Sequence, residues 1–217
     1  MKVSTDSVLL GAWAPIEHST SILDIGTGTG LLAIMAAQRN ASATITAIDI
    51  NEDATMQARE NADQSPWKER INIFTADVRE YAPELLFDAI ICNPPFFTRS
   101  LRNPDKARAT ARHDETLSLE ELSSAAASLL AGKGCVAVVL PIERRADILS
   151  AMSMHGLFLF RETRIRPTPQ KAPKRVLMAF RKEFSTQPLT DEICISSSPG
   201  QYTDEYKKIT KEFYLNF

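Results

Sequence analysis

The feature that most constrains the fold is a glycine-rich turn between an apolar run and a helix-forming stretch. The turn TGTG (27–30) follows the apolar run SILDIG (21–26) and precedes LLAIMAAQRN (31–40), whose apolar spacing is that of a helix. Glycines are needed where a chain turns sharply and where a ligand must lie against bare backbone. The helix that follows presents free N–H groups to such a ligand. This order predicts a ligand site at one edge of an α/β sheet.

The rest of the chain repeats the alternation of short apolar strands and helices. Strands that are apolar on both faces and separated by helices indicate a parallel sheet covered on each side. We expect further strands at 44–50, 71–77, 87–93 and 135–141, and helices at 52–64, 118–131 and 143–154. Ser118 and Glu121 have the spacing of a capping box at the start of one of these helices.

After residue 155 the pattern changes. Two strands, 156–166 and 175–182, are joined by a short Pro- and Lys-bearing loop, which predicts an antiparallel pair at the sheet edge. A strand at 192–197 and an amphipathic helix at 203–215 follow. The expected fold is therefore α/β and Rossmann-like, with a mostly parallel seven-stranded sheet, an antiparallel edge hairpin and helices on both faces. We expect a single domain over residues 1–217, with 183–217 as a C-terminal extension.

Composition excludes several classes of protein. The 217 residues are 44% hydrophobic and 24% charged, as in ordinary globular proteins. No uncharged apolar stretch reaches the roughly 18 residues of a membrane helix, and the N-terminus is no convincing signal peptide. Cys92, Cys135 and Cys194 lie far apart in apolar segments, which fits neither a disulfide framework nor a zinc site. We therefore expect a cytoplasmic protein without a metal.

The net charge of −2 conceals a basic middle third. Residues 1–98 hold 6 Lys and Arg against 13 Asp and Glu, whereas residues 99–182 hold 16 against 8. Residues 183–217 are acidic again, with 3 against 6. This asymmetry is compatible with a polyanionic partner. The alternative is a set of solvated surface arginines.

The acid before the glycine turn distinguishes it from a dinucleotide site. Asp24 precedes a G-x-G-x-G spacing, whereas dinucleotide enzymes have G-x-G-x-x-G. A carboxylate in the site would repel a pyrophosphate and would suit a cationic ligand or an amino group. A nicotinamide dehydrogenase is therefore disfavoured.

Two further acids end the next two strands. Asp49 lies 19 residues beyond Gly30, where a carboxylate can accept hydrogen bonds from ribose hydroxyls. Asp77 ends the third strand and is placed to accept from an adenine amino group. Each acid alone is better explained as a helix N-cap. Three acids at equivalent positions beside a glycine turn favour a ligand crevice.

The fourth strand ends in Asn93-Pro94-Pro95-Phe96. The prolines stiffen the loop and remove backbone donors. The acceptors that remain, the Asn93 side-chain oxygen and the Pro94 carbonyl, can hold the two hydrogens of a planar amino group. Phe96 offers a face on which a base can stack. A proline-rich turn with core aromatics is the structural alternative.

The loop D-x-G-x-G-x-G, the two strand-end acids and N-P-P-F together resemble the class I methyltransferases that use S-adenosylmethionine and methylate exocyclic or amide nitrogens. The chain is more narrowly similar to the bacterial tRNA-Val adenine-37 N6-methyltransferases. The segments that carry this similarity are MKVSTDSVLLGAWA (1–14), QSPWKERIN (64–72), KRVLMAF (174–180), YTDEY (202–206) and FYL (213–215). Members of that family usually carry a further stretch upstream of the M-K-V-x-T-D segment.

The resemblance implies methyl transfer from S-adenosylmethionine to N6 of an adenine in a tRNA anticodon loop, adenine 37 of tRNA-Val. Residues 1–20 would form a lid segment over the cofactor. The implied cofactor-binding residues are Thr5, Asp6, Asp24, Gly26, Gly28, Gly30, Asp49, Asp77 and Val78. The implied catalytic residues, which hold and stack the base, are Asn93, Pro94, Pro95 and Phe96. A sulfonium methyl is a strong electrophile, so positioning supplies much of the rate and no strong base is needed.

RNA recognition agrees with the charge map, and we expect a monomer with tRNA as its partner. The residues chosen as candidate phosphate contacts are Arg99, Arg102, Arg108, Arg112, Lys171, Lys174 and Arg175. The nearest alternative is another amino-group methyltransferase, acting on ribosomal RNA, DNA or a protein glutamine. A module that binds S-adenosylmethionine or RNA without catalysis is the alternative of a different class.

Overall fold

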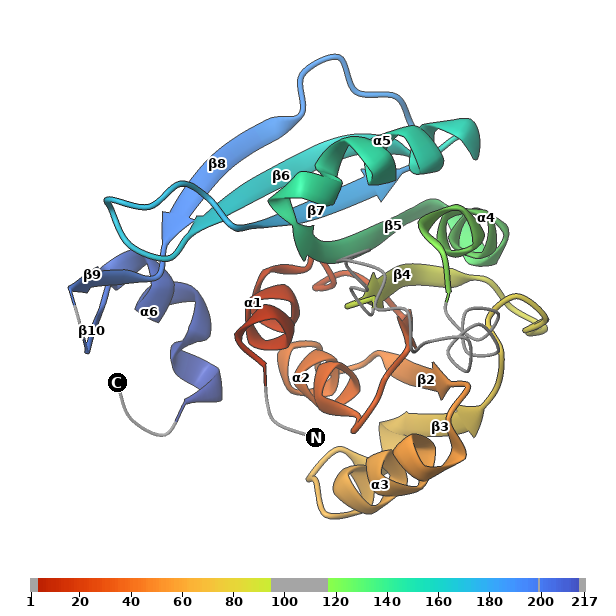
Figure 1. Cartoon of the computed structure of the whole chain (residues 1–217). Coiled ribbons are helices and arrows are strands. Elements are labelled where there is room, and N and C mark those ends of the chain that lie inside the picture. Colours follow the sequence, from red (N-terminus) through yellow and green to blue (C-terminus); the bar gives the residue numbers. More distant parts are fainter. Residues whose placement is uncertain (1–3, 95–116, 199, 215–217) are drawn as a thin grey trace, which may run out of the picture.

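The computed structural model of the chain describes residues 4–94, 117–198 and 200–214 (Figure 1). Its main feature is an eight-stranded sheet with the strand order β3-β2-β1-β4-β5-β7-β6-β8. The first half of the sheet and its helices are α1 (Thr5–Trp13), β1 (Ser21–Ile25), α2 (Leu31–Arg39), β2 (Thr44–Asp49), α3 (Glu52–Asp63), β3 (Ile71–Thr75) and β4 (Phe87–Cys92).

The second half contains the strands of the antiparallel part and the C-terminal elements. These are α4 (Leu119–Leu129), β5 (Leu130–Pro141), α5 (Arg145–Met154), β6 (Phe158–Arg166), β7 (Arg175–Arg181), β8 (Leu189–Cys194), β9 (Ser196–Ser198), β10 (Gln201–Tyr202) and α6 (Asp204–Thr210). Strands β9 and β10 form a separate two-stranded ribbon. Short 3₁₀ helices cover Lys68–Arg70, Ile142–Arg144 and Lys211–Phe213.

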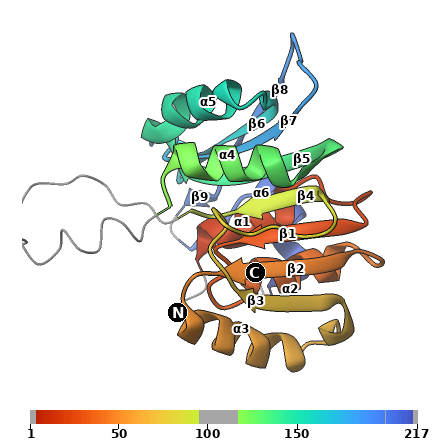
Figure 2. The same cartoon turned by 90° about the vertical axis from the view of Figure 1, so that its right-hand side faces the viewer.

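Strand directions place the ends of most strands at one edge of the sheet. Strands β3, β2, β1, β4 and β5 pair in parallel, and β7 runs antiparallel between β5 and β6. Figure 2 shows β1, β2, β3 and β4 side by side. Ile25 pairs with both Ile48 and Cys92. The residues that follow these three strands therefore meet at the carboxyl edge.

Two apolar clusters fill the two faces of the sheet. One joins the sheet to α1, α2, α3 and α6, and the other joins it to α4 and α5 (Figure 1). The helix-face residue Tyr206 is 1% exposed in the first cluster, and Ile209 packs against that cluster. Helices on both faces were expected from strands that are apolar throughout. Ser118 and Glu121 form the predicted capping box.

The structure confirms the mostly parallel α/β sheet and differs from the expectation at its last edge. A seven-stranded sheet ending in the hairpin was predicted, but β8 adds an eighth strand in parallel to β6. The antiparallel pair therefore lies one strand inside the edge. The reason is that β8 begins at Leu189, three residues before the predicted run, and most of its side chains are exposed. An edge strand with one polar face gives a weak apolar signal.

Helix α1 was not predicted as a helix. Residues far along the chain hold its C-terminal end: Trp13 Nε1 donates to Thr163 Oγ1 of β6 at 2.7 Å. The Arg161 guanidinium lies 4.4 Å from the centre of the Trp13 ring. Arg39 of α2 donates from Nη1 to the carbonyls of Gly11 and Ala14, which satisfies acceptors at the helix end. These contacts fasten α1 between α2 and β6.

Candidate functional site

The glycine turn after β1 is shaped by backbone contacts with β2. The amides of Gly26 and Thr27 donate to the Ile48 carbonyl at 2.9 and 3.0 Å. Gly26 has φ +69°, and a Cβ there would have no atom within 4 Å, so its backbone borders open space. Gly30 has φ +81°, and its Cβ would lie 3.2 Å from Cβ of Ala58. Gly30 therefore allows close helix packing, and Gly26 leaves bare backbone toward the open side.

Asp24 is fully buried beside this turn. Its Oδ2 accepts a hydrogen bond from Thr27 Oγ1 at 2.6 Å. No hydrogen bond from the described residues reaches its buried Oδ1 with normal geometry. Burial raises the pKa of Asp24 to about 7, although the Thr27 hydroxyl and the Ala33 amide pull the pKa downward. An orphaned carboxylate oxygen at this position suits a cationic or N–H-bearing ligand.

Asp49, at the end of β2, is joined directly to the glycine turn. Its Oδ2 accepts from the Gly28 amide at 2.9 Å, and Oδ1 accepts from the Asn51 amide at 3.0 Å. Gly28 has φ +56°, a backbone conformation that favours glycine. Asn51, and not Asp49, caps α3, and Gly30 occupies the N-cap position of α2. The N-cap alternative is thus wrong for the acids at the ends of β1 and β2.

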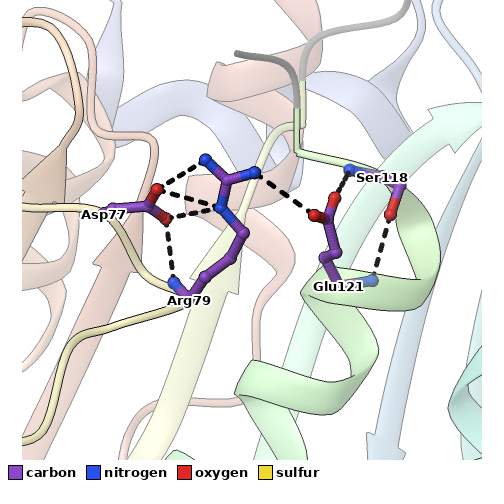
Figure 3. Close-up of polar contacts among 4 residues, drawn as sticks. All are labelled: Asp77, Arg79, Ser118 and Glu121. Atoms are coloured by element: carbon purple, nitrogen blue, oxygen red, sulfur yellow. Dashed lines mark hydrogen bonds and ion pairs between the residues drawn. The ribbon is translucent and has the colours of Figure 1, made fainter. Parts of the chain in front are cut away.

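Asp77 lies after β3 in a different environment, which Figure 3 shows. The Arg79 amide and Nε donate to Asp77 Oδ1, each at 2.9 Å, and Nε and Nη2 donate to Oδ2 at 2.9 and 2.5 Å. Arg79 Nη1 also reaches Glu121 at 3.2 Å, in the capping box of α4. These bonds hold the pKa of Asp77 below its ordinary value. Its neighbour Val78 is 7% exposed and packs in the core beside α4.

Asn93 follows β4, next to the glycine turn. Because Ile25 pairs with Cys92, Gly26 and Asn93 are the next residues along two neighbouring strands. Asn93 Nδ2 donates to Ser7 Oγ of α1 at 2.9 Å. This contact directs the amide nitrogen toward α1. Pro94 is the last described residue of this segment; the predicted site residues that lie outside the described residues are Pro95, Phe96, Arg99, Arg102, Arg108 and Arg112.

The N-terminal residues of the predicted site lie in the first turn of α1. Ser4 caps the helix, with its Oγ accepting from the Ser7 amide at 3.1 Å, and Thr5 is exposed. Asp6 Oδ2 accepts from Arg175 Nε at 2.8 Å. The structure thus joins a predicted cofactor residue to a predicted RNA contact.

Lys171 and Lys174 are exposed in the loop between β6 and β7. This loop follows β6 at the same edge of the sheet as Asn93, because β6 runs parallel to β5 in direction. At this end, Arg145 and Arg164 each donate from Nε to the fully buried Glu162, at 2.8 and 2.9 Å. The basic residues of 164–175 are therefore partly paired with acids.

Sequence reasoning missed Ser7 and Arg79 as parts of the site. Ser7 was hidden because its role depends on contact with Asn93, 86 residues away. Arg79 gave one local signal, a cation two residues after a strand-end acid, which is common in loops. The S-T-D sequence at 4–6 could have indicated a helix start, since Ser is a favoured N-cap and acids favour the first turn.

Other site chemistries find no support in the described part of the chain. Among these residues no group of three or more His, Cys, Asp or Glu side chains could hold a metal ion. None of the helices described is long and apolar enough to span a membrane. Cys92, at the end of β4, is a buried free thiol whose pKa is raised by burial and by Asp24 and Asp49. It is poorly suited to act as a thiolate nucleophile.

Comparison with known proteins shows which protein families share this sequence. Residues 3–147 match the family model described as the methyltransferase small domain. The tRNA1(Val) (adenine(37)-N6)-methyltransferase of Phocaeicola vulgatus is 46% identical over 217 residues, covering 100% of this chain and 92% of that protein. The protein of the same name from Flavobacterium johnsoniae is 41% identical over 218 residues, covering 99% of this chain and 93% of the relative.

Solved structures share the fold at lower identity. A predicted O-methyltransferase of Agrobacterium tumefaciens superposes with a TM-score of 0.76 at 20% identity, covering 95% of this chain and 96% of that chain. A putative RNA methyltransferase of Pyrococcus horikoshii gives a TM-score of 0.55 at 21% identity, covering 83% and 81%. The full-length matches at above 40% identity decide the family: this chain belongs to the tRNA1(Val) (adenine(37)-N6)-methyltransferases.

Proposed function

We propose that this protein transfers a methyl group from S-adenosylmethionine to N6 of adenine 37 in the anticodon loop of a valine tRNA. The observation that carries the proposal is the placement of Asn93 and Pro94 beside the glycine turn, at the end of the strand that neighbours β1. The substrate comes from the names of relatives that match this chain over its full length.

The residues at the carboxyl ends of β1 and β2 and in the glycine turn fit this cofactor. Asp24 has a buried oxygen to which none of the described residues donates a hydrogen bond, which suits the cationic amino group of the methionine part. The bare backbone at Gly26 leaves room against the turn. Asp49 is assigned to the ribose hydroxyls, and Asp77 with Val78 to the adenine. When bound, the cofactor supplies an electrophilic methyl group on a sulfonium sulfur.

Asn93 and Pro94 act on the substrate amino group. The Asn93 oxygen and the Pro94 carbonyl accept its two hydrogens, which holds the nitrogen and helps its lone pair to leave conjugation with the ring. Pro95 stiffens the loop, and Phe96 stacks on the base. Because the reaction needs orientation more than a strong base, no histidine is assigned a role. Anticodon-loop bases are already partly unpaired, so extruding one costs less than in a duplex.

The remaining parts of the proposal concern the partners and the setting. Lys171 and Lys174 contact tRNA phosphates, together with the arginines of the 99–112 stretch. The protein acts as a monomer without a metal, in the cytoplasm, where free thiols such as those of the three described cysteines persist. Residues 1–20 serve as the lid segment and residues 183–217 as an extension of one methyltransferase domain.

The experiment uses labelled S-adenosylmethionine and total tRNA that lacks this modification. We expect N6-methyladenosine at one position of one tRNA after digestion. Asn93→Ala should lower turnover by at least about a hundredfold, because it removes a group that orients the attacking nitrogen. This loss should exceed any loss of cofactor affinity that follows from the missing contact with Ser7. Asp49→Ala should weaken cofactor binding. The matched control is Asn72→Ala, an exposed asparagine of β3.

The outcomes separate the proposal from its alternatives. Normal turnover of Asn93→Ala contradicts the assigned mechanism. Cofactor binding without transfer to tRNA, but with transfer to ribosomal RNA, DNA or a protein glutamine, contradicts the substrate. Cofactor or tRNA binding without any transfer indicates a noncatalytic module.

A further inference from the structure

The first turn of α1 is attached to two separate strands at the carboxyl edge of the sheet. Ser7 Oγ accepts from Asn93 after β4, and Asp6 Oδ2 accepts from Arg175 Nε at 2.8 Å. Asp6 and Arg175 form an ion pair whose side chains are 21% and 36% exposed. The two residues are 169 positions apart. The pair therefore connects the first turn of α1 to the start of β7.

Arg175 lies at the start of β7, at the carboxyl edge of the sheet. It is the first residue of β7, opposite Pro141 of β5 and Ile165 of β6. Both of these strands end at the edge where Gly26 and Asn93 lie. From this place Arg175 reaches the N-terminal end of α1, while Trp13 and Arg39 hold the other end. The helix is thus fastened at both ends, and its first turn lies at the strand ends that border the glycine turn.

The guanidinium is directed toward protein groups. Its Nε donates to Asp6, and its Nη1 donates to the Lys174 carbonyl at 3.1 Å. An arginine that grips a phosphate through its planar fork uses two N–H groups side by side. The side-by-side pairs of a guanidinium are Nε with Nη2 and Nη1 with Nη2. In Arg175 one nitrogen of each pair already serves the Asp6 carboxylate or the backbone of its own loop.

We propose that Arg175 is a positioning residue of the cofactor site and not an RNA contact. By holding Asp6, it keeps the first turn of α1 over the strand ends, so that this turn can close against the bound cofactor. The inference rests on the proposed cofactor site. It replaces the assignment of Arg175 to phosphate binding and predicts that Arg175 and Asp6 act as one unit.

The test is a double-mutant cycle read by two binding measurements. Calorimetry gives the Kd for S-adenosylmethionine with wild type, Arg175→Gln, Asp6→Asn and the double variant. Filter binding gives the Kd for unmodified tRNA at several salt concentrations. We expect each single substitution to weaken cofactor binding about tenfold, the scale of a partly buried pair. The double variant should be no weaker than either single variant, and tRNA affinity should change less than twofold.

The matched control is Arg166→Gln. Arg166 lies at the end of β6 and donates from Nε to Glu192 at 2.6 Å, so it is an arginine of the same edge in a pair of similar geometry. Its substitution should leave the cofactor Kd within twofold of wild type. A loss of affinity as large as that of Arg175→Gln would show that any lost ion pair at this edge suffices, and would overturn the inference.

Three further outcomes decide the matter. Unchanged cofactor affinity in Arg175→Gln overturns the proposal. Weakened tRNA binding with a salt slope reduced by about one also overturns it and assigns Arg175 to RNA. If Arg175→Gln fails to fold, Asp6→Asn reports the same interaction from the other side. Wild-type protein that binds no S-adenosylmethionine contradicts the proposed cofactor site itself, and the inference falls with it.

Discussion

Two aspartates at the same edge of the sheet, Asp24 near the end of β1 and Asp77 after β3, are in opposite electrostatic states. Asp24 is fully buried, and its pKa is raised to about 7 by burial. Asp77 is half-buried, and Arg79 lowers its pKa. Sequence position alone made these two acids equivalent. A strand-end carboxylate therefore takes its ionisation state from its burial and from the side chains that the neighbouring turn places beside it.

The difference has consequences for ligand binding. Asp24 keeps a buried oxygen without a hydrogen bond from the described residues. A bound cationic group would therefore remove the free-energy cost of burying an unpaired polar atom. Asp77 already accepts four hydrogen bonds from Arg79 (Figure 3). A ligand amino group must therefore compete with the guanidinium for Asp77. We expect Asp24 to contribute much more to cofactor affinity than Asp77 does.

The largest expected effect is that of Asp24→Asn. This change keeps the size and the acceptor for Thr27 but removes the charge that would pair with the cofactor. Removing one partner of a buried ion pair costs roughly 3–5 kcal/mol, so the Kd for S-adenosylmethionine should rise by about a hundredfold or more. Calorimetry measures this change. A loss below tenfold would place the cation-binding role elsewhere and remove the contrast between the two acids.

A second prediction concerns pH. Below pH 7 the unliganded protein holds a proton on Asp24 that a bound cation must displace, so affinity should fall by about tenfold per pH unit between pH 7 and 5. Asp24→Asn should lack this dependence. Calorimetry in two buffers of different ionisation enthalpy should detect about one proton released by wild type at pH 6.

The same shift affects stability with a definite sign. In the unfolded chain the ordinary pKa is 3.8, so between about pH 4 and pH 7 the folded protein binds a proton that the unfolded chain has lost. The contribution of Asp24 to stability therefore decreases as pH rises through that window, by roughly 4 kcal/mol in total. Thermal melts from pH 5 to 8 should show this loss in wild type but not in Asp24→Asn. Parallel curves would contradict the buried, protonated state.

The smallest effect is expected from Arg79→Ala. It releases the Asp77 oxygens, so cofactor affinity should increase by a few fold, since an exposed ion pair contributes about 0–1 kcal/mol. The matched control is Arg144→Ala, which removes an exposed arginine paired with Asp147 three residues later. Weaker cofactor binding in Arg79→Ala would mean that Arg79 orients Asp77 and does not compete for it.

Much of the fold was accessible from the sequence because its signals are local. The apolar runs at 44–50 and 87–93 predicted β2 and β4 almost to their observed bounds. Strand β8 was largely missed as part of the sheet, since its mostly polar, exposed residues carry little periodic signal. Helix α1 was missed for another reason. Its nine residues are stabilised by contacts with β6 and α2, which no window of sequence contains.

The features of the site also divide into those that local sequence predicts and those that depend on the folded structure. The glycine turn and the placement of Asp24, Asp49 and Asn93 at one edge follow from strand ends in a parallel sheet, and the structure brings these residues together. The protonation of Asp24 depends on depth of burial, which sequence does not report. The engagement of Asp77 by Arg79 depends on a side-chain rotamer. The pairing of Asp6 with Arg175 depends on β7 lying next to β5, which is a property of topology.

That topology sets the order in which contacts can form during synthesis on the ribosome. Asp6 leaves the ribosome 169 residues before Arg175, which is roughly 10 to 30 s at ordinary rates of synthesis. Thr163, the hydrogen-bond partner of Trp13, is synthesised 150 residues after it. The first helix to be translated is thus among the last to complete its contacts. A nascent chain released before β7 would carry the five parallel strands of the sheet, with α1 held by α2 but not yet by β6 or β7.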